Sequence, residues 1–309
     1  MKLLKRLFGI SPVPAKSFRT RSGKSFSTFA PEGLKFREAE SLRQIEVRFE
    51  QVFRKHESYW ENVKDRLFAE HPGMSEKTYS WLLFEFKRFL GMNILLKKVG
   101  MYSSSVDEVW HAALMFTQQY QTFCEDLLGS MVHHAPHVGN AVKPGKHDRA
   151  LFELVYSTIF EVFDENITLL GKFNVHKLDP KFLNRVLSCD RAFLLDNYFK
   201  TNLIREFEAA AADTVSQIIE QFRTAKNRPQ NRSKSERRRA GASNTSDSSG
   251  SDVLNTILFW NLFNDDGGKS TRDSSCSSES HDSGSGSSSG SDGSSSSCSS
   301  SSCGSSCSS

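Results

Sequence analysis

The sequence has 309 residues, of which 37% are hydrophobic and 25% are charged, and its formal net charge is +4 at neutral pH. It contains no run of about 18 apolar residues, which argues against a membrane-spanning helix, and too little strand-like alternation for an all-β fold. Residues 271–309 hold 23 serines and four cysteines but no aliphatic side chain, so this segment cannot bury enough apolar surface to fold.

The charge is distributed unevenly along the chain. Residues 1–243 carry 38 basic and 28 acidic side chains, a balance of +10, whereas the residues from 244 onward carry two basic and eight acidic ones, a balance of −6. We favour the interpretation that these charges form an ordinary solvated surface. The alternative is that the basic part contacts the acidic tail or another anionic partner.

Cysteine usage and the N-terminal residues bear on the compartment. Only Cys124 and Cys189 fall outside the serine-rich region, which is too few for a disulfide framework, so we expect a reduced, cytoplasmic protein. Within residues 1–10, basic side chains interrupt the apolar ones, and no secretory signal is predicted. A short membrane-surface helix is the alternative to a frayed start.

Two long helices are predicted in the first third of the chain, after a proline- and serine-rich lead-in over residues 1–31. Apolar residues recur three or four apart over 34–69, and His71-Pro72-Gly73 should end that helix. The second helix should begin after Ser75 as its N-cap and run to about Val99, with Gly100 closing it. It is apolar on most sides and should therefore be central.

The remaining elements are also helical. A third helix should start at Ser104 or Ser105, each of which forms a capping-box pattern with Asp107 or Glu108, and run toward 129–132. We expect a loop over 135–147 to follow, and then a fourth helix over 148–171. A short fifth helix should begin after Asp179-Pro180, and a last long helix should cover 191–226. The prediction is an all-α fold, a single bundle-like domain of five or six helices over 32–226.

Three further segments are predicted beyond this domain. Residues 227–252 should be a basic and polar linker, although the basic run 223–239 could bind phosphate groups of nucleic acid or of an anionic surface. Residues 253–264 form a short apolar segment, too short to span a bilayer, that should dock on the domain or on a partner. Residues 265–309 should be a disordered serine- and cysteine-rich tail, open to phosphorylation, oxidation or weak thiol ligation.

The most distinctive stretch of the sequence lies at 106–136. It reads VD-x-x-WH, then Y-x-x-FC, a glycine and HH-x-P. In this order and spacing it resembles the signature of the glycine-rich domain-containing protein family and its short bacterial relatives. The resemblance implies a helical fold followed by a low-complexity tail, but no defined activity. Many members of that family have a second histidine where this chain has Ala113. The motif residues are Asp107, Trp110, His111, Tyr120, Phe123, Cys124, Gly129, His133, His134 and Pro136.

Several motif residues have side chains that can ligate a metal. Asp107 and His111 are four apart and should lie on one face of a helix, where the carboxylate can accept a proton from the imidazole. A histidine at the edge of an apolar stripe is more often a hydrogen-bonded packing residue, and we favour that interpretation of His111. His111 and His133 are 22 residues apart, about 33 Å along one straight helix. A shared zinc site would therefore require the chain to reverse near Gly129, or ligands from other helices.

The candidate ligands were Asp107, His111, Cys124, His133 and His134, with zinc the candidate metal; His137 and His147 could join a cluster in the loop. Cys124 lies on the wrong side of its helix to use His111 as a base, and we expect it to pack as a small hydrophobic residue. No catalytic residue is assigned. The sequence favours a non-enzymatic module that binds an unknown protein partner, with metal binding or a metal-dependent enzyme as the first alternative and anionic-surface or nucleic-acid binding through 223–239 as the second.

Overall fold

The computed structural model describes residues 26–37, 39–134, 145–201, 204–227 and 250–263. Several predicted segments lie outside the described residues. These are most of the lead-in, most of the loop 135–147 with Pro136 and His137, most of the basic run and the whole serine-rich tail. The predictions made for those segments therefore stay predictions.

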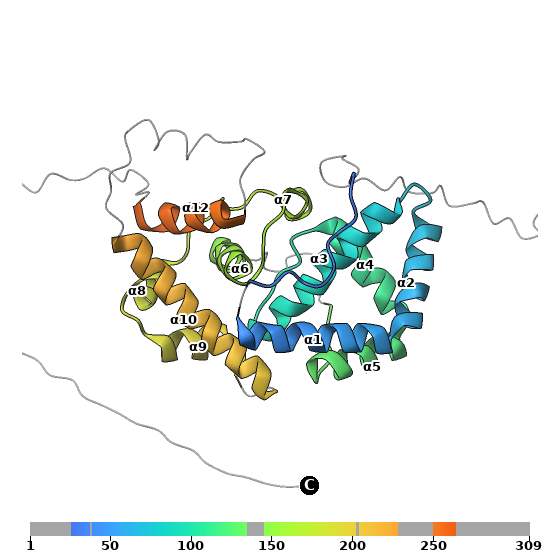
Figure 1. The fold of residues 1–309 in the computed structure, drawn as a ribbon, viewed down its shortest axis with the longest axis horizontal. Coiled ribbons are helices and arrows are strands. Elements are labelled where there is room, and N and C mark those ends of the chain that lie inside the picture. Colours follow the sequence, from blue (N-terminus) through green and yellow to red (C-terminus); the bar gives the residue numbers. More distant parts are fainter. Residues whose placement is uncertain (1–25, 38, 135–144, 202–203, 228–249, 264–309) are drawn as a thin grey trace, which may run out of the picture. The chain divides into compact units, whose positions relative to one another are not determined.

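The described residues form eleven α-helices and no β-strand, which confirms the all-α class. Figure 1 shows their arrangement. The predicted number was wrong, because each long helix expected from the sequence, except the second, consists of two shorter ones. The helices are α1 Glu40–Lys55, α2 Glu57–Glu70, α3 Glu76–Leu95, α4 Ser104–Leu114, α5 Thr117–Leu128, α6 Lys146–Ile159, α7 Asp164–Leu170, α8 Pro180–Leu187, α9 Arg191–Tyr198, α10 Arg205–Asn227 and α12 Gly250–Phe263.

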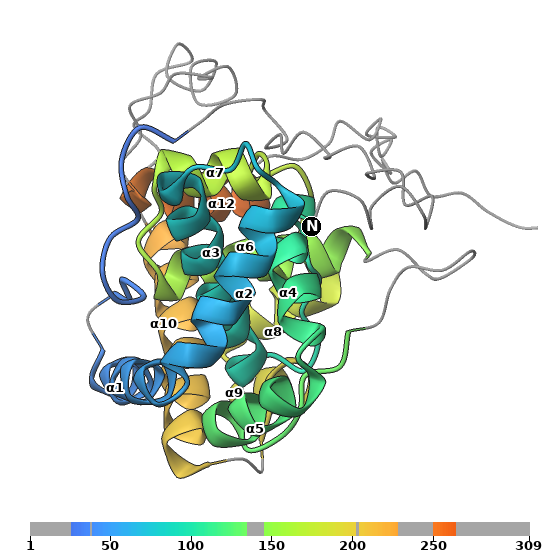
Figure 2. The same ribbon diagram turned by 90° about the vertical axis from the view of Figure 1, so that its right-hand side faces the viewer.

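The helix predicted over 34–69 is broken at His56, between α1 and α2. Figure 1 shows α1 lying across the view with α2 rising from its end, and Figure 2 shows α1 nearly along its axis. The apolar period continues across the break, but the two halves pack on different partners: α1 on α5 and α10, and α2 on α4. The predicted end at His71 is confirmed.

Helix α3 is central, as predicted. Ser75 is its N-cap, and the serine side chain accepts a hydrogen bond from the amide of Thr78. Fourteen of its 20 residues are buried, including some on every side. It ends at Leu95 and not at Val99, because Leu96 pairs with Phe199 in an isolated β-bridge that satisfies the backbone groups at this helix end.

A second bridge, between Phe36 and Phe160, ends α6 in the same way. The helix predicted over 148–171 is therefore two helices, α6 and α7. The first bridge likewise ends α9 at Tyr198, so the helix predicted over 191–226 is α9 and α10. The short helix after Asp179 is confirmed, with that aspartate as N-cap and proline at the first helical position.

The third predicted helix is also divided, into α4 and α5. The N-cap of α4 is Ser103 and not Ser104 or Ser105, and the Ser103 side chain accepts a hydrogen bond from the amide of Val106. The predicted capping boxes with Asp107 and Glu108 are therefore wrong. The helix breaks at residues 115–116, where the amide of Phe116 donates to the carbonyl of Ala113.

The apolar segment near the C-terminus is the helix α12, which packs on α6 and α10. Leu254, Ile257 and Leu258 are its buried residues, and the Asn261 side chain accepts a hydrogen bond from the amide of Leu178. This segment thus covers part of the same helical body. Among the described residues, none of the helices has both the length and the apolarity needed to cross a bilayer.

Candidate metal centre

The first part of the centre is the exposed side of α4. Val106, Val109, Trp110 and Ala113 face the core, so Asp107 and His111 lie on the opposite side of the helix. Their side chains are four residues apart as predicted, with His111 Nε2 3.8 Å from Asp107 Oδ2. The Asp107 side chain is 28% exposed and that of His111 is 51% exposed.

The second part comes from the chain after α5, which reverses direction at Gly129. This glycine has φ +74° and ends α5 in the left-handed conformation that residues with a Cβ rarely adopt. The segment 131–134 then returns toward α4. His134 Nε2 lies 3.2 Å from Asp107 Oδ1, and the His134 and His111 rings are 4.7 Å apart between centroids.

The ligating atoms of Asp107, His111 and His134 all lie within 4.8 Å of one another. Bonds of about 2.0–2.2 Å in a tetrahedral arrangement place neighbouring ligand atoms roughly 3.3–3.6 Å apart. The half-exposed His111 ring can close this difference by rotating about its side-chain torsions. Two histidines and one carboxylate are the donors of many catalytic and non-catalytic sites for divalent transition metals. The residues present therefore fit a metal ion.

A short chain of hydrogen bonds determines where the returning segment lies. Trp110 Nε1 donates to the Tyr120 hydroxyl over 2.8 Å, and that hydroxyl donates to the carbonyl of Val132, also over 2.8 Å. The Trp110 ring also packs against the edge of His134, with 4.6 Å between centroids. Trp110 and Tyr120 thus support the centre without offering it a ligand.

The other motif residues are placed away from the cluster. Cys124 is fully buried, and burial raises the pKa of its thiol, so the thiolate form is disfavoured. Phe123 packs in the aromatic core against Phe53 and Trp60. His133 lines a neighbouring cavity and is not a member of the cluster.

Two other positions named from the sequence also lie apart from the centre. His147 is on α6, where its Nδ1 accepts from the amide of Asp179. Ala113 is fully buried on the core side of α4, and its carbonyl accepts from the Tyr59 hydroxyl. Position 113 is therefore not placed to supply a ligand to this cluster.

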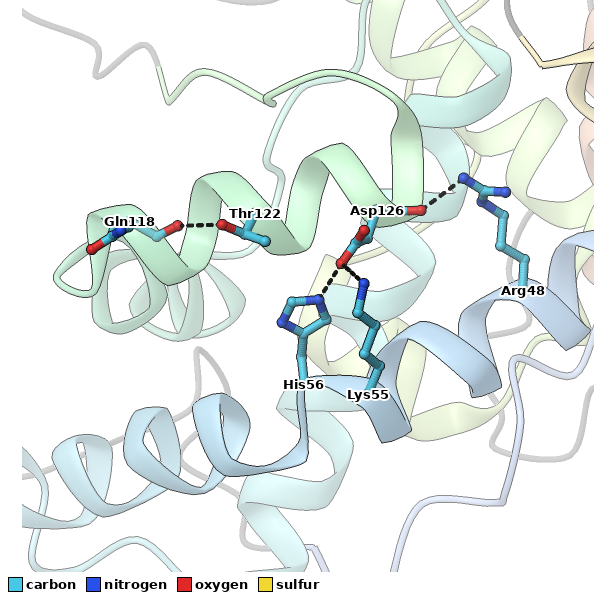
Figure 3. Close-up of polar contacts among 6 residues, drawn as sticks. All are labelled: Arg48, Lys55, His56, Gln118, Thr122 and Asp126. Carbon is cyan, nitrogen blue, oxygen red and sulfur yellow. Dashed lines mark hydrogen bonds and ion pairs between the residues drawn. The ribbon is translucent and has the colours of Figure 1, made fainter.

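The C-terminal end of α5 is held against the corner between α1 and α2 by a polar cluster (Figure 3). The Asp126 carboxylate accepts from Lys55 Nζ over 2.7 Å and lies 2.6 Å from His56 Nε2. Arg48 donates to the carbonyls of Asp126 and Leu127, which end the helix just before Gly129. Sequence analysis missed this cluster because its members are about 70 residues apart and share no local motif.

We expect Asp126→Asn to lower the melting temperature at neutral pH by about 2–4 °C. Hydrogen bonds from Lys55 and His56 hold the pKa of Asp126 below its ordinary value. A carboxylate with a lowered folded pKa stabilises the fold above its unfolded pKa and loses this effect as the pH falls through the folded value. The difference from wild type should therefore shrink toward pH 3 in a thermal-melt series.

The matched control for this prediction is Asp213→Asn, which changes an exposed aspartate on α10 and should leave the melting temperature within about 1 °C of wild type. A difference between Asp126→Asn and wild type that stayed constant from pH 7 to pH 3 would show that the Asp126 charge does not contribute.

The fold and this centre define the chain as a helical protein with a two-histidine, one-carboxylate cluster at its surface. Residues 48–222 match the model of the UCP032817-like family, and since the match spans more than half of the sequence, the chain belongs to that family. The matched range contains all three residues of the cluster. Comparison with curated proteins and with solved structures gave no significant match. The family name specifies no reaction or ligand, so function is argued from the site.

Proposed function

We propose that this protein binds a divalent transition metal ion, zinc being the first candidate, through Asp107, His111 and His134. The observation that carries the proposal is the convergence of these side chains. Two residues of α4 meet a histidine 27 positions further along the chain, after a reversal at a glycine with positive φ. The sequence indicated that these residues could share a metal ion only if the chain reversed direction near Gly129, and it does reverse there.

The chemistry of the donors supports the same proposal. Neutral imidazole and carboxylate are good ligands for zinc and related ions, and three protein ligands leave a coordination position for water or another molecule. Because the His111 side chain is half-exposed, we expect that position to face solvent. A bound ion would supply Lewis acidity there, while the role of this chain's residues is to hold the ligands in place.

The resemblance of 106–136 to glycine-rich domain-containing proteins leads us to propose a shared arrangement in which Trp110, Tyr120 and Gly129 serve to bring His134 back to α4. The non-enzymatic binding module and anionic-surface binding through 223–239 stay hypotheses without a supporting contact. Residues 228–239 lie outside the described residues, and the apolar face of α12 is covered by α6 and α10.

The test is a Zn²⁺ titration of the full chain by calorimetry, after chelator treatment and without a histidine tag. Cys276, Cys298, Cys303 and Cys307 are changed to serine in every sample, because thiolates in the tail could bind zinc themselves. We expect one equivalent of Zn²⁺ to bind. Asp107→Ala and His134→Ala should each weaken it by at least about tenfold to a hundredfold.

The matched control is His133→Ala, which removes the neighbouring imidazole and should leave the zinc affinity unchanged. Co²⁺ provides a second readout, since its visible spectrum should report a low-symmetry site with nitrogen and oxygen ligands and no thiolate charge-transfer band. Zinc affinity that was equal in wild type, His134→Ala and His133→Ala, or no binding at all, would overturn the proposal.

A further inference from the structure

A cavity of about 200 Å³ lies beside the segment that leads to His134, and residues 130–133 of that segment line part of it. Its wall comes from several parts of the fold: Asn93 of α3, the segment after Gly129, Lys200 after α9 and Phe207 of α10. Pockets for drug-sized ligands usually have 300–1,000 Å³, so this one suits a smaller molecule. His133 lines this cavity, whereas the next residue, His134, belongs to the candidate metal centre.

Lys200 is the principal charge in the wall of this cavity. Its backbone is fixed, since its amide donates to the carbonyl of Leu95 over 2.8 Å in the bridge that ends α3. Burial lowers the pKa of its ammonium group, which is about half-buried. In the described part of the chain, no carboxylate forms an ion pair with Lys200, whereas Lys55, Lys64 and Lys98 each have one.

The charge in the cavity wall is positive. Among the described residues that line the cavity, Lys200 is the only lysine or arginine, and none is an aspartate or glutamate. Behind Phe207, the Arg48 guanidinium lies 5.6 Å from the centre of that ring. A half-buried cation loses hydration energy that an ion pair would return. A negatively charged group is therefore the natural complement of Lys200.

The other residues in the cavity wall indicate what the uncharged part of such a ligand should contain. Phe207, Met131 and Val132 offer apolar contacts. The Asn93 side chain donates its Nδ2 to the carbonyl of Phe89 over 2.8 Å, which leaves its Oδ1 as an acceptor at the cavity. A few polar groups within an apolar wall are typical of sites that fix the orientation of a small ligand.

We propose that this cavity binds a small organic oxyanion, a carboxylate or a phosphate monoester with a short apolar body, through the Lys200 ammonium group. The inference goes beyond metal binding, because it depends on a different set of side chains. Its failure and the failure of zinc binding are therefore separable.

The test uses three probes with the same apolar body, n-butyrate, n-butyl phosphate and n-butanol, added to the full-length protein. Binding is measured by saturation-transfer NMR and by the shift in melting temperature. We expect at least one of the two anions to bind and butanol to bind no better than the background. The preferred anion then distinguishes a carboxylate ligand from a phosphate ligand.

Two variants test the site from different directions. Lys200→Met keeps the length and the apolar stem but removes the charge, and should weaken the preferred anion by about tenfold or more. Met131→Trp should fill the cavity and block binding while Lys200 remains. Lys181→Met, which changes an exposed lysine of α8, is the control and should bind as wild type does.

The Zn²⁺ affinity of Lys200→Met should equal that of wild type, which separates this site from the metal centre. Binding of neither anion to the wild-type protein would overturn the proposal. Equal binding by wild type and a folded Lys200→Met protein would overturn it too, as would anion binding that survives Met131→Trp.

Discussion

Arg88→Ala is expected to lower the free energy of unfolding by about 3–5 kcal/mol, the largest effect of any single change considered for this protein. Arg88 is fully buried in α3. Its Nε donates to the carbonyl of Leu34, and one terminal nitrogen donates to the Tyr156 hydroxyl and the Glu161 carbonyl. One side chain therefore joins the segment before α1, α6 and the connection between α6 and α7 to the central helix.

The environment of the guanidinium explains why its removal should cost so much. The Arg88 Cζ atom lies 4.2 Å from the centre of the Phe84 ring and 4.7 Å from the centre of the Phe160 ring. Alanine at this position would therefore leave a large cavity. It would also leave Glu85, which is buried beside Tyr156 and Asn166, without the nearby positive charge. A buried charge that loses its compensating partner is strongly destabilising.

The pH dependence of stability gives this prediction a second readout. Burial raises the pKa of Glu85 to about 7, although Arg88 acts to lower it. A carboxyl with a raised folded pKa stabilises the fold fully below its unfolded pKa, and this contribution is lost as the pH rises through the folded value. Wild-type stability should therefore decline between about pH 4.5 and 7 on account of this group. In Arg88→Ala the decline should extend to higher pH, and in Glu85→Gln it should disappear.

Urea unfolding followed by circular dichroism measures these free energies. Arg88→Lys retains the charge but cannot reproduce the planar fork, and should recover only part of the loss. Arg43→Ala is the control, since that side chain is 74% exposed, and should change stability by less than about 0.5 kcal/mol. A loss below about 1 kcal/mol in Arg88→Ala would contradict the assigned role.

Tyr120→Phe is expected to weaken zinc binding by about tenfold to a hundredfold, although Tyr120 supplies no ligand. Its hydroxyl accepts from Trp110 and donates to the Val132 carbonyl, two residues before His134. Phenylalanine would leave both groups without this partner in a buried place, which costs about 1–3 kcal/mol of stability. The segment 131–134 would then no longer be held against α4.

The control is Tyr102→Phe. The Tyr102 hydroxyl is buried without a hydrogen-bond partner within the described part of the chain, so its removal should leave stability equal or slightly higher and zinc affinity unchanged. Calorimetric Zn²⁺ titrations and urea unfolding of both variants separate the two effects. If Tyr120→Phe lost stability but bound zinc as tightly as wild type, the hydroxyl would support the core and not the metal centre.

Local patterns in the sequence were sufficient to predict those features that depend on residues within one helical turn. Ser75 and Asp179 cap the helices they were predicted to cap, because an N-cap depends on a side chain and an amide only two or three residues away. The i, i+4 pairing of Asp107 and His111 has the same origin. Wherever the helix end depends on a partner far along the chain, as for α3, α6 and α9, the predicted boundary was wrong.

The candidate ligands show the same division. Residues 133 and 134 are both histidines, but only His134 belongs to the cluster, whereas His133 lines the cavity. No local pattern distinguishes them. The Tyr120 hydroxyl donates to the Val132 carbonyl, and His134 is the histidine that reaches Asp107. The sequence likewise contains no indication that Lys200 or Arg88 would be enclosed, because both depend on partners more than 50 residues away, such as Asn93 for Lys200 and Leu34 and Tyr156 for Arg88.

The sequence by itself determined that the protein is all-α, that α3 is its central helix and that Asp107 and His111 share one face of α4. These properties follow from periodicity and from contacts within one helical turn. Only the tertiary structure decided where the long apolar patterns break, that His134 and not His133 or Cys124 completes the cluster, and that Lys200 faces a cavity. Those outcomes depend on which distant helices bury each apolar stripe and satisfy each helix end, and a local pattern does not encode them.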